Sequence, residues 1–166
     1  MTRRFGLALA LSLFAVSLAV TSLSPAQAAD PIILTVSGKH AETGAPTVIE
    51  LSLPDIEALE SDVLRTTTLW TEGEIAFRGV RMEKLFPLLG LAQPERVRCT
   101  ALNEYKVELP LRDARETTVL MAYARDGAYM RIRENGPLWI IYPRDSGIVD
   151  APNRMIWQLR KMEAVY

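Results

Sequence analysis

The chain has 166 residues, of which 49% are hydrophobic, and its formal net charge at pH 7 is −1. This length and apolar content suit one globular domain with a real core. A net charge so close to zero does not indicate binding to nucleic acid or to an anionic membrane surface. With one cysteine and one histidine, the sequence excludes an internal disulfide and a conventional zinc site built from these ligands.

The N-terminal segment is typical of a secretory signal peptide. Arg3 and Arg4 precede an uncharged apolar run, residues 5–23, and Ala26 and Ala28 supply the small residues that signal peptidase reads. We therefore expect residues 1–28 to be cleaved, the protein to be periplasmic or secreted, and no membrane span to remain. An uncleaved anchor is the alternative, because the run approaches the roughly 20 residues that span a bilayer.

Short strands and helices alternate irregularly in the first half of the remaining chain. β-Branched residues predict strands at 32–36, 47–51, 63–70 and 75–79, the last of them ending at Gly79. Proline and acidic residues open a short helix at 54–59. Apolar residues at helical spacing predict another helix at 81–89, which Pro87 should kink or end early.

The second half is richer in strands. Alternating residues predict a hairpin of strands 96–102 and 105–109 that turns at Asn103. One helical turn is expected at 111–115, and further strands are expected at 118–124, 137–142 and 155–165. There is no β-α-β alternation and no internal repeat. The pattern favours one α+β domain over residues 29–166.

Four short segments carry a resemblance through their order and spacing. They are FRGV at 77–80, NEY at 103–105, LMAYARDG at 120–127 and GPLWIIYPRD at 136–145. Together they resemble the molybdopterin-binding domain of the sulfite oxidase family, and in particular small exported bacterial proteins that carry this domain alone. The resemblance implies a sulfite-oxidase-type α+β fold, with mostly short strands and a few short helices.

The resemblance also implies a molybdenum atom held by a pterin dithiolene and one cysteine thiolate. A soft thiolate suits such a centre. In the family this cysteine lies shortly before the segment that matches 77–80, but residues 65–73 here read RTTTLWTEG and contain none. Cys99 lies later, on the same alternating face as Val97 and Ala101, and we expect it to be a buried structural residue.

Three positions that the resemblance assigns to pterin contacts have also lost their polar or cationic character. Family members that bind the cofactor carry histidine, arginine and lysine where this chain has Asn135, Trp139 and Ile156. Charge-assisted contacts to phosphate are among the stronger ones that a protein makes. Their joint loss argues against tight binding of an anionic pterin, so we expect no cofactor and assign no metal ligand.

The remaining polar and aromatic residues near the family's pocket-forming segments are candidates for binding a ligand. They are Asn103, Tyr105, Asn135, Trp139, Tyr142, Arg144 and Trp157. No catalytic residue is assigned. The first hypothesis is an exported module that binds a small molecule or a periplasmic or membrane protein partner. The simpler interpretation makes the tryptophans core residues and Arg144 part of a surface turn.

Two alternatives remain open. In the first, the chain is an active molybdenum-cofactor oxidoreductase that transfers an oxygen atom or two electrons at a metal site without cysteine. This alternative implies folded export through the Arg3-Arg4 pair. In the second, Cys99 is a redox-active thiol, although no cationic residue is clearly placed to lower its pKa.

Overall fold

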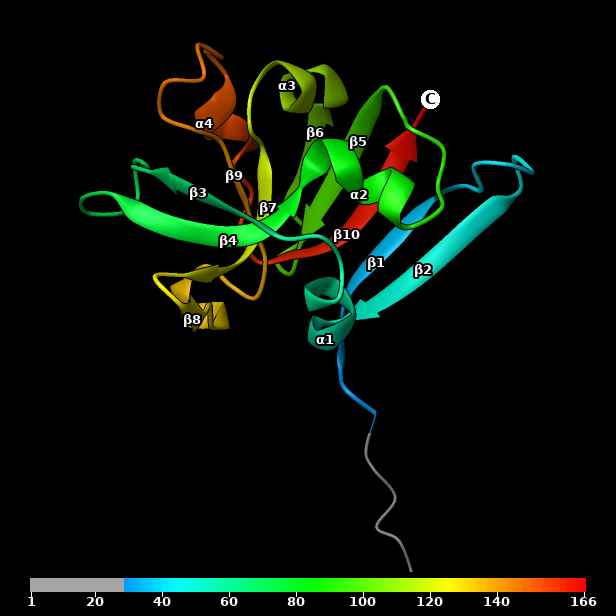
Figure 1. Cartoon of the computed structure of the whole chain (residues 1–166), viewed down its shortest axis with the longest axis horizontal. Helices are drawn as coiled ribbons and strands as arrows, with labels where there is room; N and C mark the ends of the chain where they lie inside the picture. Colours follow the sequence, from blue (N-terminus) through cyan, green and yellow to red (C-terminus); the bar gives the residue numbers. More distant parts are fainter. Residues whose placement is uncertain (1–28) are drawn as a thin grey trace, which may run out of the picture.

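Two five-stranded sheets dominate the structure (Figure 1). The computed structural model describes residues 29–166, and the predicted signal peptide lies outside the described residues. The first sheet has the order β2-β1-β10-β5-β6, in which only β1 and β10 pair in parallel. Its strands are β1 (Ile32–Lys39), β2 (Pro46–Ser52), β5 (Arg96–Ala101), β6 (Lys106–Pro110) and β10 (Leu159–Val165).

The second sheet has β7 at its centre. The order β3-β4-β7 is antiparallel, and β8 and β9 both pair with the remaining edge of β7. The strands are β3 (Asp62–Thr66), β4 (Ile75–Arg81), β7 (Leu120–Arg125), β8 (Ala128–Tyr129) and β9 (Trp139–Ile141). Every residue of β9 is fully buried, as expected for an apolar strand covered on both faces.

Short helices connect and cover the strands. They are α1 (Leu53–Glu57), α2 (Met82–Leu88), α3 (Leu111–Glu116), the 3-10 turn η1 (Ile132–Glu134) and α4 (Ala151–Arg154). Ser52 begins α1, because its hydroxyl accepts from the Asp55 N–H while the Asp55 carboxylate accepts from the Ser52 N–H. None of the helices within residues 29–166 is long and apolar enough to cross a membrane.

The buried side chains of both sheets form one hydrophobic cluster. Val36 of β1, Cys99 of β5 and Met162 of β10 line up across the first sheet, since Met162 is in register with both of the others. Phe77 of β4 and Trp139 of β9 bring the second sheet into the same cluster. The predicted α+β class, with mostly short strands and a few short helices, is therefore confirmed.

Several predicted boundaries differ from the structure: the strand expected at 155–165 begins at Leu159, and the one expected at 137–142 spans only Trp139–Ile141. The strand expected at 63–70 ends at Thr66, and residues 67–74 form a loop. Gly79 was expected to end a strand but lies inside β4, next to a register shift against β7. A Cβ atom at position 79 would lie 2.0 Å from the Met121 carbonyl oxygen. The glycine therefore permits close approach of two backbones and does not mark a turn.

We expect Gly79→Ala to destabilise the protein by about 3 kcal/mol or more, because the added methyl group meets rigid backbone and β4 and β7 must separate. Urea unfolding followed by circular dichroism measures this change. Ala76→Gly, on the same strand, is the matched control and should cost about 1 kcal/mol. Equal losses for the two variants would contradict the packing role given to Gly79.

Candidate functional site

Two neighbouring pockets lie where the two sheets meet α4. The first, here called the aromatic pocket, has a volume of about 340 Å³. Its walls include Trp70, Ala101, Asn103, Tyr105, Met155 and Trp157, with Pro152, Asn153 and Ile156 completing them. The residues come from the loop after β3, from the end of β5 and the turn that follows it, from α4, and from the segment between α4 and β10. Within residues 29–166, no charged side chain lines this pocket.

The second pocket, here called the threonine pocket, has a volume of about 300 Å³. The loop after β3 contributes Thr67, Thr68 and Leu69, and the segment after β9 contributes Tyr142, Arg144 and Ser146. Pro152 and Met155 line both pockets, so one wall serves the two. Both volumes fall near the lower end of the range usual for small-molecule sites.

A cluster of aromatic rings lies next to the aromatic pocket, and two of its members, Trp70 and Trp157, line that pocket. Trp139 is fully buried and meets Phe77, Trp70 and Trp157 edge-to-face at centroid distances of 5.6, 6.2 and 6.2 Å. Its indole N–H donates to the Met155 carbonyl at 3.2 Å, so its polar atom is satisfied. Trp70 also contacts Trp157 at 5.3 Å, yet 41% of its surface remains exposed. One aromatic ring of the cluster is thus open to solvent.

Threonine hydroxyls hold the loop that separates the pockets. Thr68 Oγ1 lies 3.0 Å from Thr71 Oγ1 and accepts from the Trp70 N–H at 3.1 Å. Thr66 Oγ1 accepts from the Arg144 N–H at 2.8 Å, which joins the loop to the segment after β9. These bonds explain why the strand ends early, because threonine side chains compete with a sheet for local backbone donors.

The structure separates the predicted site residues into four groups. Asn103, Tyr105 and Trp157 line the aromatic pocket, whereas Tyr142 and Arg144 line the threonine pocket. Trp139 lines neither pocket and is fully buried. Asn135 lines neither pocket; it follows η1 in a left-handed conformation, and its carbonyl accepts from the Gln158 N–H.

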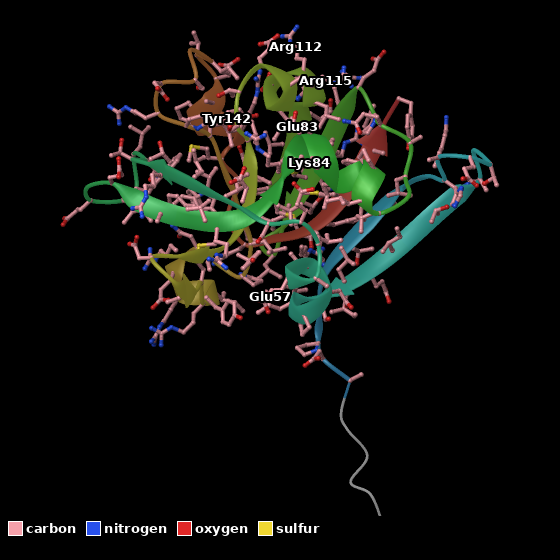
Figure 2. The ribbon with its side chains drawn as sticks, in the orientation of Figure 1. Glu57, Glu83, Lys84, Arg112, Arg115 and Tyr142 are labelled. Atoms are coloured by element: carbon pink, nitrogen blue, oxygen red, sulfur yellow. The ribbon has the colours of Figure 1, made fainter. Side chains whose placement is uncertain are left out.

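A buried polar network beside the threonine pocket was not predicted from the sequence. Asp113 of α3 is only 3% exposed in its side chain, and its carboxylate accepts from Tyr142 Oη at 2.9 Å and Arg154 Nη1 at 2.5 Å. Arg154 also pairs with Asp150 at 3.5 Å. Figure 2 shows Tyr142 beside α4, the helix that Arg154 ties to Asp113. The network therefore fixes the wall that the two pockets share.

Burial and charge together set the proton affinity of this network. Burial, followed by the nearby Asp113 carboxylate, raises the pKa of Tyr142 well above its usual range, so the phenol stays protonated and keeps donating. Burial has the largest single effect on Arg154 and lowers its pKa, but the hydrogen bond and the charge of Asp113, helped by Tyr142 and Asp150, together outweigh burial, and the net direction of the pKa is upward. The sequence held no signal for the network, since Asp113 and Arg154 lie far apart along the chain.

Cys99 is placed as its alternating pattern predicted. It is fully buried on β5, and desolvation raises the pKa of its thiol to about 12. A thiol with so high a pKa is almost entirely protonated at neutral pH and is a poor nucleophile and metal ligand. Within residues 29–166, no three acidic, histidine or cysteine side chains gather as a metal site would require.

An α+β domain with two sheets and a cleft at their junction defines the class of protein, and the comparisons with known proteins identify the family. The model of the oxidoreductase molybdopterin binding domain family matches residues 43–160. The chain therefore belongs to this family, whose members resemble sulfite oxidase in this domain. No curated protein matches the chain.

We expect Tyr142→Phe to lower the free energy of unfolding by about 2 kcal/mol at pH 7, because the buried Asp113 carboxylate loses one of its donors. The matched control is Tyr129→Phe, whose hydroxyl bonds to Glu57 at an exposed site and should change stability by less than about 0.5 kcal/mol. Urea unfolding measures both. A negligible effect of Tyr142→Phe would contradict the energetic role of the network.

The same variant gives a pH test. Because the pKa of Tyr142 is raised on folding, its contribution is fully present below the unfolded-state pKa of about 10 and is lost as pH rises above it. The stability gap between the wild type and Tyr142→Phe should thus narrow above about pH 10. A gap that stays constant across this range would contradict the upward direction of the pKa shift.

Cys99 should react with a thiol reagent only when the protein unfolds, because its thiol is buried and its pKa is raised to about 12. Ellman's reagent at pH 8 tests this, with and without urea, and Cys99→Ser serves as the zero-thiol control. Rapid labelling of the folded protein would contradict the burial of Cys99 and would revive its candidacy as a redox-active thiol.

Proposed function

We propose that this chain is an exported member of the molybdopterin-binding domain family that lacks the standard molybdenum centre and binds a small ligand in the paired pockets. The observation that supports the proposal most directly is the chemistry of the loop after β3. The family's cysteine is expected there, but the loop offers threonine hydroxyls, and those of Thr66 and Thr68 already bond to backbone N–H groups.

The residues present do not fit a thiolate-held molybdenum atom. The chain's single thiol, Cys99, is buried in β5 and lines neither pocket. Hydroxyl oxygen is a hard ligand, whereas the family's centre uses a soft thiolate. No step of a molybdenum reaction is therefore assigned to these residues.

The residues at the predicted pterin contacts do not fit an anionic group either. Trp139 is fully buried among aromatic rings, and Ile156 is 3% exposed. Neither provides the positive charge that a phosphate group needs when it leaves water. The carbonyl of Asn135 is engaged by the Gln158 N–H, so this residue serves the turn before β9. The paired pockets are better suited to another ligand.

A protein partner is the second candidate occupant. Leu69 and Val149 line the threonine pocket and are 66% and 94% exposed, which leaves apolar surface at its rim. Such surface favours an interaction site. Family membership itself favours the remaining alternative, an active oxidoreductase that holds the cofactor without a cysteine ligand.

The decisive measurement is the molybdenum content of the protein purified from the exported fraction of its own host, by elemental mass spectrometry. We expect a content far below one atom per chain in protein that circular dichroism shows to be folded. A sulfite oxidase-family enzyme purified from the same cells provides the positive control for cofactor supply. About one atom per chain would overturn the proposed function and establish the oxidoreductase alternative.

A further inference from the structure

The aromatic pocket has a composition that selects among ligands. Trp70 and Tyr105 are 41% and 53% exposed on its walls, so each presents part of a ring to whatever enters. Exposed aromatic faces at the mouth of a pocket favour stacking with a flat ring. The edge-to-face contacts of Trp70 with Trp157 and Trp139 hold its ring in place before a ligand arrives.

Charges next to the aromatic pocket are already paired. Glu104, between the lining residues Asn103 and Tyr105, forms an ion pair with Arg160. Arg154, which follows Asn153 in the chain, is engaged by Asp113 and Asp150. An anionic ligand would therefore lose its hydrating water without gaining a cationic partner, and this loss would weaken its binding.

The exposed arginines of α3 surround a different hollow. Arg112 and Arg115 line a separate depression together with Arg96, and none of the three lines the aromatic pocket. Figure 2 shows Arg112 and Arg115 projecting outward from α3. This separation leaves the aromatic pocket electrically neutral.

Two side chains, Asn103 and Trp157, supply hydrogen-bond donors to the aromatic pocket. Asn103 Oδ1 accepts from the Tyr105 N–H at 3.1 Å, which leaves the side-chain NH₂ group to donate. The indole N–H of Trp157 has no acceptor within residues 29–166 and is not cut off from solvent. Donors present the positive end of their dipoles, so they match carbonyl or ring-nitrogen acceptors and disfavour a cation.

We propose that the aromatic pocket binds a neutral, planar ring system with carbonyl acceptors on its rim. The ring stacks against Trp70 and Tyr105, and its carbonyl oxygen accepts from the Asn103 amide or the Trp157 indole. A volume of about 340 Å³ accommodates a fused bicyclic ring. This inference rests on the proposed function only in requiring a pocket that is open to ligands.

Isothermal titration calorimetry with three bicyclic probes of similar size tests the inference. Menadione is neutral and has two carbonyl groups, 2-hydroxy-1,4-naphthoquinone is anionic at neutral pH, and 2-methylnaphthalene has no acceptor. We expect menadione to bind at least about tenfold more tightly than either of the others, which corresponds to about 1.4 kcal/mol. Cys99 is buried, so the quinones should not react with its thiol.

Variants locate the binding. Trp70→Leu and Tyr105→Leu should each weaken menadione binding by about tenfold, because each removes a stacking face. Tyr129→Leu is the matched control, since Tyr129 is 56% exposed, lies on β8 outside the pocket and should leave affinity unchanged. Tyr105 lies on an exposed turn, so its variant keeps the test valid even if Trp70→Leu fails to fold.

Three results would overturn the inference: no menadione binding, equal affinity for the anionic probe, or affinity that is indifferent to both Trp70→Leu and Tyr105→Leu. These outcomes are distinguishable from failure of the proposed function. Molybdenum at about one atom per chain overturns the proposed function whatever the probes do. If the protein contains no molybdenum and does not bind menadione, only the inferred class of ligand is overturned.

Discussion

The burial of Trp139 is the constraint on which the rest of the cleft depends. Its backbone belongs to β9 at the edge of β7, while its isolated bridge to Trp157 reaches the segment that leads into β10 of the other sheet. Its indole N–H donates to the Met155 carbonyl, and its ring contacts Trp70 edge-to-face. One side chain therefore links the two sheets and contacts Trp70, Trp157 and Met155, which line the pockets, and buried residues packed at near-crystalline density cannot shift separately.

A second constraint, the hydrogen-bond network around Asp113, fixes the wall that the two pockets share. A buried carboxylate is tolerated only when its lone pairs are satisfied, and here Tyr142 and Arg154 supply donors from two other segments. Losing either donor would leave the buried Asp113 carboxylate without a hydrogen bond that water cannot replace. The three segments are therefore held in one relative position. Because Arg154 belongs to α4, that position also sets Pro152 and Met155, which both pockets share. The hydrogen bonds to one buried carboxylate therefore determine the shape of an otherwise apolar cleft.

Local patterns predicted those parts of the fold that local physics controls. Alternation at 96–109 predicted a hairpin, and β5 and β6 form it; helical spacing near Pro87 predicted a short helix, which ends at Leu88. Gly79 misled the prediction because its reason is a contact with a strand more than forty residues away. The site was less predictable still. Asn103, Tyr105 and Trp157 converge only through sheet pairing, and the sequence pattern places Trp70 at the end of the strand predicted at 63–70, with no sign that it lines a pocket.

Substitution of a few side chains can change the ligand of a fold without changing the fold. The strands that carry the cleft owe their stability to buried apolar residues, and the loop after β3 owes its shape to threonine hydroxyls that bond to local backbone. Neither depends on a metal. Under the proposed function, threonine hydroxyls in place of a thiolate, and tryptophan and isoleucine in place of cations, disfavour an anionic, metal-bearing cofactor. A family member with this composition is therefore expected to retain the shape of a cofactor site while selecting a different chemistry.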